Sequence, residues 1–409
     1  MSQIGILLEL LCRPGLAGGT DLVGRYEQAF ARTVLGDASR PCLAFGKGRV
    51  ALWTVLRALA SQSGGEVAVP AFTCEMVPAA VKFAGLRCVY ADVAAGGFNA
   101  GAAELAGAIG PATQAVVCQH TYGIGPDPAA MRRLSTGGSA VLIEDCCQLA
   151  DLPAGPDGPT RLGAVAFFST QWNKPFSTGL GGMAAFNDSS LYSAVGDMRS
   201  AFGRAGDRAR SRSLAIQALA YELTVRPATQ AAVAKMYRFA QRHGWVRGTN
   251  TAGDYDQTMP DDYPCGATNL QAILGLRQLR RWDSNVAHRR MLTGFYLQRL
   301  AEFGIDTMPL GATCGQALWA VPLLVDNKAE LLARAERDAL AVATWFDVPP
   351  VHLAEATAGR YDYRPGSCPA SEWMVPREIH LPTSPAVSLD RAQATWKFLQ
   401  RHARFTSPR

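Results

Sequence analysis

Short runs of apolar residues, separated by glycine, proline or charged residues, recur along the first half of the chain. They predict strands at residues 65–70, 87–93, 115–120, 141–145, 164–168 and 182–186. Most of these runs are continuous rather than alternating with polar residues, which is typical of strands buried on both faces. Helical stretches lie between them and indicate βαβ units, so we expect an α/β fold with a mostly parallel sheet.

The second half of the chain predicts a smaller α/β domain. A helix is expected to begin at Thr268 or Asn269 and to continue towards Leu300. It is followed by strands around 317–324 and helices at 328–340 and 389–402. We therefore predict a large domain at 1–250, which includes a short N-terminal helix at 4–11, and a small C-terminal domain at 251–409.

Residues 190–250 form an arginine-rich helical insertion in the large domain. The segment carries Arg199, Arg204, Arg208, Arg210 and Arg212, then an Ala/Leu-rich helix at 213–223 and a basic helix at 228–243. One interpretation is a solvated helical excursion that covers the functional site or packs in a dimer. The other is a docking surface for a bulky anionic substrate or partner.

Composition narrows the class of protein. The chain has 409 residues, of which 48% are hydrophobic and 18% are charged, and its formal net charge is +6. A mild positive charge without runs of like charge suits a small anionic substrate and argues against nucleic-acid binding. The cysteines form no CxxC pair and the histidines show no metal spacing, so we expect free cytoplasmic thiols and no metal site. The apolar stretch at 4–11 is too short to be a transmembrane segment.

The segment from Phe167 to Gly182 carries the most specific chemistry. Lys174 lies in a polar loop after an apolar strand, with Ser169 before it and glycines after it, and a second strand ends on Asp145. A lysine, a strand-end carboxylate and a nearby hydroxyl are the groups needed to hold pyridoxal phosphate. The amine forms an imine with the cofactor, the carboxylate keeps the pyridine nitrogen protonated, and the hydroxyl binds a phosphate oxygen.

A glycine-flanked segment opens a helix earlier in the chain. Gly46, Lys47, Gly48 and Arg49 precede a helix that is predicted to end near Leu59. Free backbone N–H groups at a helix start favour a phosphate, and glycine lets the backbone approach the ligand closely. Alone, such a glycine pair is more often a simple turn.

Each candidate also has a purely structural interpretation. Asp145 would cap the next helix, with Gln148 as a capping-box partner. Lys174 would be a surface lysine, and Ser169 would satisfy only the backbone. His120, at the end of a strand, would be a structural histidine rather than a site residue.

Taken in order, these segments resemble the DegT/DnrJ/StrS family of pyridoxal-phosphate sugar aminotransferases, from about Gly46 to the C-terminus. The similar segments are GEVAVPAFT at 65–73, ADV at 91–93, FN at 98–99, QHTYG at 119–123, IEDCCQ at 143–148, FS at 168–169 with the lysine loop up to 182, TNLQA at 268–272 and HLPT at 380–383. Each motif is modest, but the ordered set over most of the chain is specific.

The resemblance implies a fold type I transferase with a large domain, a smaller C-terminal α/β domain and sites at the interface of a homodimer. Lys174 would carry the cofactor, Asp145 would pair with the pyridine nitrogen, and Gln148 would lie beside the ring. Ser169 and the backbone at Gly48–Arg49 would hold the phosphate.

Two further residues, His120 and Tyr122, are candidates for contact with the substrate. Three positions depart from the family pattern. Cys74 stands where the family has an aromatic residue that stacks on the cofactor ring, and Leu180 stands where a glutamate is common. Pro264, beside Tyr263, falls where the family has an asparagine that reaches the partner subunit's cofactor phosphate. These departures point to a substrate other than an ordinary nucleotide sugar.

The leading hypothesis is a pyridoxal-phosphate-dependent aminotransferase. It would move an amino group from glutamate or glutamine to a keto sugar, a cyclitol or a related biosynthetic intermediate. One alternative keeps the cofactor and changes the reaction to elimination or dehydration. Another is a non-catalytic, cofactor-binding protein with a regulatory or docking role.

Overall fold

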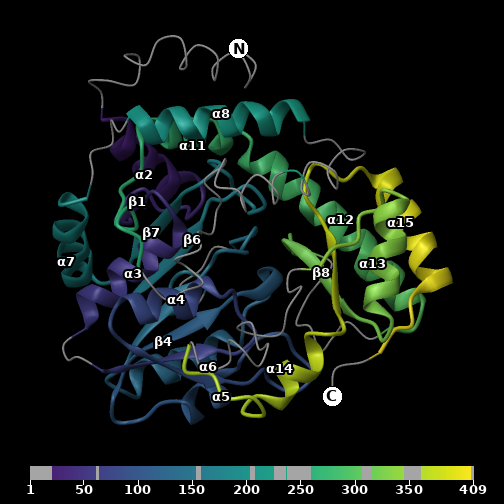
Figure 1. Ribbon diagram of the computed structural model, residues 1–409, viewed down its shortest axis with the longest axis horizontal. Coiled ribbons are helices and arrows are strands. Elements are labelled where there is room, and N and C mark those ends of the chain that lie inside the picture. Colours follow the sequence, from purple (N-terminus) through teal and green to yellow (C-terminus); the bar gives the residue numbers. More distant parts are fainter. Residues whose placement is uncertain are drawn as a thin grey trace.

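A computed structural model describes residues 21–60, 64–152, 158–202, 208–224, 236, 259–305, 315–344 and 361–406 (Figure 1). The helix predicted at 4–11 lies outside the described residues, as does all but one residue of the basic helix predicted at 228–243. The described chain is a mixed α/β structure with one large sheet and one small sheet.

The large sheet has seven strands in the order β1-β7-β6-β5-β4-β2-β3. They are β1 Cys42–Phe45, β2 Glu66–Pro70, β3 Arg87–Ala91, β4 Thr113–Gln119, β5 Val141–Asp145, β6 Val165–Ser169 and β7 Gly182–Phe186. Neighbouring strands from β2 to β6 pair in parallel, while β7 is antiparallel to β6 and to β1. The mostly parallel sheet is confirmed, and β1 is a short edge strand that the apolar pattern did not predict.

Alternate side chains of the strands enter different cores, because successive residues of a strand point to opposite faces. Leu43, Phe45 and Phe167 pack with helices α3 Gly48–Leu59, α4 Met76–Phe83 and α7 Ser189–Ser200. On the other face, Ala44 and Phe168 pack with α2 Leu22–Thr33 and α11 Asn269–Leu279. Val116 and Leu142 pack with α5 Ala102–Gly107 and α6 Pro128–Thr136. Both faces of the sheet are therefore covered by helices, as expected from the continuous apolar strands.

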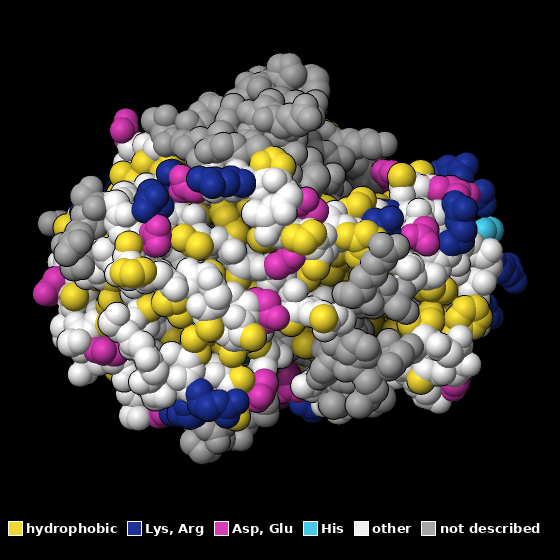
Figure 2. All heavy atoms as spheres, turned by 90° about the horizontal axis from the view of Figure 1, so that it is seen from below, with side chains coloured by type: hydrophobic (Ala, Val, Ile, Leu, Met, Phe, Trp, Pro, Cys, Tyr) yellow, Lys and Arg dark blue, Asp and Glu magenta, His cyan; other side chains and the backbone are white. Residues whose placement is uncertain are grey.

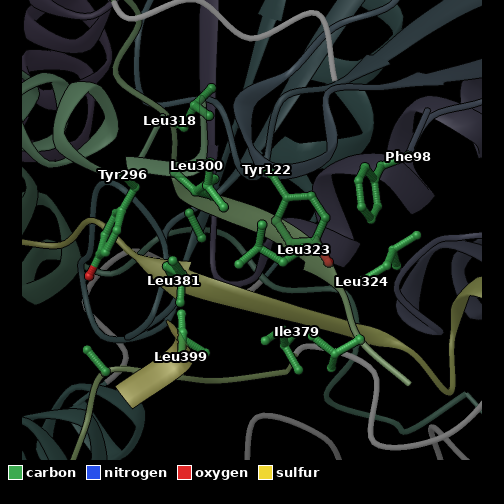
Figure 3. Close-up of a cluster of buried hydrophobic side chains, with 14 of the residues drawn as sticks. Phe98, Tyr122, Tyr296, Leu300, Leu318, Leu323, Leu324, Ile379, Leu381 and Leu399 are labelled. Atoms are coloured by element: carbon green, nitrogen blue, oxygen red, sulfur yellow. The ribbon is translucent and has the colours of Figure 1, made fainter. Parts of the chain in front are cut away.

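The small sheet pairs β8 Ala320–Leu324 with β9 Glu378–Pro382 in antiparallel fashion. Helices α12 Trp282–Glu302, α13 Lys328–Arg337, α14 Pro369–Met374 and α15 Leu389–His402 accompany it. Their buried side chains form one cluster, shown in Figure 3. Strand β9 was not predicted, since its alternate residues Glu378 and His380 are polar although both are buried.

The helix predicted from residue 268 to about 300 is in fact two helices, α11 and α12, which are separated at Arg280–Arg281. Helix α11 packs on α2, beside the large sheet. Trp282, at the start of α12, joins the same cluster, whereas Leu292 and Leu300 further along belong to the small-sheet cluster. We therefore propose that the boundary between the two domains lies within α12 rather than at residue 250.

Part of the arginine-rich insertion is described as α8 Arg208–Thr224, which contains the helix predicted at 213–223. In Figure 1 this helix lies across one end of the molecule, above α11 and α2. Leu214 and Ala218 pack against Leu270 of α11 and against Trp172 and Leu180 of the lysine loop. The helix therefore covers the loop that carries Lys174.

The surface carries both charges. On the face shown in Figure 2, Lys and Arg side chains lie among Asp and Glu side chains rather than in one continuous area. Among the helices of the described part of the chain, none is both long enough and apolar enough to cross a membrane.

Candidate active site at the carboxyl edge of the large sheet

The candidate site residues follow strand ends that meet at one edge of the sheet. β4, β5 and β6 are parallel, so His120, Asp145 and Ser169, at or just after their carboxyl ends, lie along the same edge. β1 also runs parallel to β6, because β7 is antiparallel to both. The start of α3 after β1 is thereby brought to this edge, which is where open α/β sheets bind their ligands.

The start of α3 approaches the neighbouring strands with no space for side chains. A Cβ atom on Gly48 would lie 2.9 Å from Cα of Ser169, and one on Gly182 would lie 2.5 Å from Cα of Gly48. Lys47, the residue before the helix, makes no capping hydrogen bond with its side chain. Because the first N–H groups of a helix have no partner within it, this close junction beside the Ser169 hydroxyl suits a phosphate.

Helix α11 braces this junction through Gln271. Thr268 and Gln271 form a capping box, with the Thr268 N–H 2.8 Å from Oε1 of Gln271. The amide nitrogen of the same glutamine donates to the carbonyl of Gly46 at 3.1 Å and to that of Leu180. One side chain therefore connects the segment before α3 with the end of the lysine loop.

Asp145 is a buried carboxylate with modest compensation. Its Oδ1 accepts the N–H of Cys147 at 2.9 Å. Burial raises the pKa of Asp145, and the hydrogen bonds from Cys147 and the charge of Lys174 offset only part of this rise. A cationic N–H group beside Asp145 would favour its ionised form.

Glu144, the preceding residue, is held in a different way. Its fully buried carboxylate accepts N–H groups from Thr160 at 2.8 Å, Leu162 at 2.8 Å and Gly163 at 3.1 Å, and lies 3.1 Å from Nε2 of His120. Burial raises the pKa of Glu144, but the hydrogen bond and charge of His120 with these N–H groups lower it further, so the net shift is downward.

His120, Glu144 and Cys146 are close enough together to suggest metal ligands among the described residues. The oxygens of Glu144 are, however, already occupied by hydrogen-bond donors. Burial also holds the pKa of the Cys146 thiol well above its usual range, which disfavours the thiolate that a metal needs. We interpret this group as structural.

The loop that carries Lys174 is fixed on both sides of the lysine. Asn285 of α12 donates to the carbonyl of Pro175 at 2.9 Å, and the indole N–H of Trp319 donates to the carbonyl of Asn173 at 2.7 Å. The Lys174 amine lies 5.7 Å from the centre of the Trp319 ring. Trp319 is a neighbour of the lysine that the sequence analysis did not identify.

Gln148 and Tyr122 are linked to each other. The Tyr122 N–H donates to Oε1 of Gln148 at 2.5 Å, which leaves the amide nitrogen of Gln148 buried and with no hydrogen-bond partner among the described residues. Tyr122 is itself fully buried, and its phenol donates to Glu378 at 2.6 Å. The phenol is thus engaged within the protein, as is Nε2 of His120.

The three positions that depart from the family pattern have defined surroundings. Cys74 is partly buried beside Met76 and Tyr361, and burial raises the pKa of its thiol, against the effect of Lys174. Leu180 packs under α8. Pro264 follows Tyr263, which is fully buried and lies edge-on to the rings of Trp53 and Phe83 in the core beneath the sheet.

These groups fit pyridoxal phosphate. Asp145 matches a protonated pyridine nitrogen, and the unpartnered amide of Gln148 matches a hydrogen-bond acceptor on the ring. The junction of Gly48, Ser169 and Gly182 matches the phosphate, and Lys174 matches the aldehyde.

Comparison with known proteins agrees with this chemistry. The model of the DegT/DnrJ/EryC1/StrS aminotransferase family matches residues 15–234 and 225–400. A GDP-perosamine synthase of Caulobacter vibrioides is 28% identical over 283 residues, and the match covers 69% of this chain and 64% of that protein, just under two thirds of its length. The spore coat polysaccharide biosynthesis protein SpsC of Bacillus subtilis is 23% identical, over 90% of this chain and 86% of its own length.

Solved structures share the fold. The structure of NtdA from Bacillus subtilis with bound cofactor PMP superposes with a TM-score of 0.72 at 19% identity, over 97% of this chain and 80% of that chain. At this level of identity the likeness is one of fold, and it confirms the fold type I architecture.

The raised pKa of Asp145 predicts how the stability of the cofactor-free protein depends on pH. The folded protein binds more protons at this group than the unfolded chain does, so ionising Asp145 costs stability as pH rises above the ordinary value of 3.8. We expect an Asp145→Asn variant to be as stable as the wild type at low pH and more stable at neutral pH. The measurement is urea unfolding of the apo protein between roughly pH 4 and pH 8, where a carboxyl group with a raised pKa titrates.

Asp188→Asn is the matched control. The hydrogen bonds from Ser190 and Leu191 lower the pKa of Asp188, so it contributes stability above its unfolded pKa that is lost on acidification. This variant should be less stable than the wild type at neutral pH and no different at low pH. The same pH trend in both variants would contradict the account of Asp145.

Proposed function

Because the chain belongs to the DegT/DnrJ/EryC1/StrS aminotransferase family, and is therefore an aminotransferase that uses pyridoxal phosphate, we propose that it aminates a keto sugar, a cyclitol or a related biosynthetic intermediate. The amino donor is glutamate or glutamine. The names of the two relatives, a GDP-perosamine synthase and a polysaccharide biosynthesis protein, support an acceptor of this class. The observation that carries the proposal is the placement of Lys174, in a braced loop at the sheet edge that also carries Asp145.

Each residue has a proposed task. When bound, the cofactor supplies a ring that accepts the electron pair left as a proton leaves the substrate carbon. Lys174 would hold the cofactor and, through its amine, move that proton, and Asp145 would accept a hydrogen bond from the ring nitrogen. The amide nitrogen of Gln148, which has no partner among the described residues, would donate to an acceptor on the ring, and Cys74 would lie beside the ring.

The phosphate has its own set of donors. Ser169 and the N–H groups of Gly48 and Arg49 bind its oxygens at the start of α3. His120 acts by holding Glu144, and hence the end of β5, rather than by touching the substrate.

We propose that the acceptor carries an anionic group. A cavity of about 280 Å³ adjoins the phosphate junction and is lined by Lys47, Arg210, Ser213, Gln217 and Asp262, among others. Burial raises the pKa of the nearby Cys265 thiol. The charge of Asp262 adds to this rise, and three cations oppose it: Arg210, Lys47 and Arg49. Three cations and one carboxylate thus surround this thiol, and their net positive charge favours an anion.

The main test follows the amino group. Purified holoenzyme with ¹⁵N-labelled L-glutamate or L-glutamine should convert from the visible-absorbing form of its cofactor to the amine form, and the label should then pass to a keto-sugar or keto-cyclitol acceptor. Lys174→Ala should lose the visible absorbance and at least roughly 10³-fold of the half-reaction rate. Lys397 is an exposed lysine, and Lys397→Ala should behave as wild type.

Two results would overturn the proposal. Bound cofactor that no amino donor alters would point to elimination chemistry or to a regulatory role. A Lys174→Ala protein that keeps full turnover would remove the lysine from the mechanism.

The cavity predicts a charge effect. GDP and inorganic pyrophosphate, used as probes in titration calorimetry, should bind the wild type and bind Arg210→Glu about tenfold more weakly, with the difference shrinking at high salt. Arg212→Glu is the matched control, since Arg212 lies on the same helix and is exposed. An equal loss in both variants, or no binding by the wild type, would exclude this cavity as the anion site.

We propose a homodimer that resides in the cytoplasm. Ile216 and Leu223 are 52% and 55% exposed on α8, which supports an apolar contact with a second copy. The eight cysteines in the described part of the chain are free thiols, as suits a reducing compartment. Sedimentation at micromolar concentration should give a dimer, and Ile216→Glu combined with Leu223→Glu should weaken it; a wild-type monomer would contradict the proposal.

A further inference from the structure

Trp319 contacts the lysine loop in two ways. It immediately precedes β8 of the small sheet and is 8% exposed. Its indole N–H binds the carbonyl of Asn173, and its ring face lies 5.7 Å from the amine of Lys174. An indole face at this distance attracts an ammonium group, because the ring carries negative charge density on its faces.

The backbone of Trp319 is held from both sides. Its N–H donates to the carbonyl of Tyr122 at 2.9 Å, and its carbonyl accepts from Thr383 at 2.9 Å and from Arg289 at 3.2 Å. Arg289 also binds Asn285 at 2.9 Å, the residue that holds the carbonyl of Pro175. One set of hydrogen bonds therefore places both the indole and the loop that carries Lys174.

Tyr122 places Trp319 and Gln148 together. Its ring is stacked on that of Trp319, with the centres 6.1 Å apart and the planes 17° apart, and its N–H holds Gln148. The backbone of Tyr122 has φ 61°, a left-handed conformation that is costly for a bulky residue. Such a conformation persists only where the surroundings determine it.

The small sheet holds the phenol end of Tyr122, while the rings of Phe72 and Phe98 contact its ring from the large domain. Its phenol donates to Glu378, which is fully buried and also lies 3.0 Å from Nδ1 of His380 and 2.8 Å from the Thr344 hydroxyl. Figure 3 shows the Tyr122 ring among side chains of this domain, near Leu323 and Leu324. Tyr122, which follows β4 of the large sheet, thus links Glu378 of the small sheet to Gln148 and Trp319.

We propose that Trp319 is a positioning residue, which holds the amino group of Lys174 whenever that group is not joined to the cofactor. Tyr122, fixed by Glu378, sets the positions of Trp319 and Gln148 relative to each other. An aminotransferase lysine is released from the cofactor in every half-reaction and must stay within reach of the substrate carbon. The indole face attracts the released amine without carrying a charge of its own, so it adds no second carboxylate beside Asp145. This proposal rests on the proposed role of Lys174.

The first test uses apo protein and so does not depend on turnover. Brief treatment with acetic anhydride at neutral pH, followed by peptide mass spectrometry, measures acetylation of Lys174 relative to Lys397 in the same molecule. Because the indole face covers the amine at 5.7 Å and its N–H holds the loop beside it, Trp319→Leu should raise the relative acetylation of Lys174 about threefold or more, and Trp319→Phe should raise it less.

Trp373→Leu is the matched control. Trp373 also carries a cation over its ring, the guanidinium of Arg377 at 4.6 Å, but it packs in the small domain. It should leave the acetylation of Lys174 unchanged. Equal acetylation of Lys174 in wild type, Trp319→Leu and Trp373→Leu would overturn the proposal.

The second test uses holoenzyme in single-turnover reaction with L-glutamate. Trp319→Leu should lower the saturating rate about tenfold and change the half-saturating glutamate concentration by less than about twofold, because positioning acts on the rate. Tyr122→Phe, which loses only the bond to Glu378, should have a smaller effect of the same kind. It should add little to Trp319→Leu in the double variant, since the two act along one path.

Visible circular dichroism of the bound cofactor provides a readout of geometry. It should fall in Trp319→Phe and Tyr122→Phe and stay unchanged in Trp373→Leu. A purely structural role predicts lower stability with unchanged dichroism and unchanged single-turnover rate, which would overturn the proposal. A wild type that fails to react with any amino donor would overturn the proposed function, while the acetylation result would still decide the contact between Trp319 and Lys174.

Discussion

The site depends on the hydrogen bonds that surround the buried carboxylate of Glu144. It has no exposed surface, so its charge is tolerated only because N–H groups from three residues of the 160–163 segment and the ring of His120 surround it. These donors come from the end of β4 and from the segment that enters β6. The carboxyl ends of β4 and β5 and the start of β6 are thereby held together, and the alternation of the strand turns Asp145 to the opposite face from Glu144.

Residues of both the large and the small domain form the site. The large sheet contributes Asp145, Ser169 and the start of α3. Helix α12 and the residue before β8 contribute Asn285 and Trp319, which hold the carbonyls on either side of Lys174. Movement of the small domain would therefore displace the lysine relative to the phosphate junction.

The departures from the family pattern share a physical theme. Cys74 stands where the resemblance leads us to expect an aromatic residue, and Tyr263, the neighbour of Pro264, is a core residue beneath α3. Cations gather instead beside the phosphate junction, where Lys47 and Arg210 line the adjoining cavity. These surroundings agree with the proposal that the site serves an acceptor other than an ordinary nucleotide sugar.

The sequence by itself determined the large sheet and the groups that follow its strand ends. Buried parallel strands need continuous apolar runs, and glycines, a strand-end aspartate and a loop lysine are local signals, so Asp145, Ser169, Lys174 and Gly48 could be predicted as site residues without coordinates. The short edge strand β1 and the polar strand β9 lack the apolar period, and the break between α11 and α12 lacks a proline or glycine signal. Only the tertiary structure decided that Trp319 and Asn285 brace the lysine loop and that Tyr122 joins Gln148 to Glu378. These residues lie far from Lys174, Gln148 and Tyr122 in the chain, and such contacts depend on how whole elements pack, which no local pattern records.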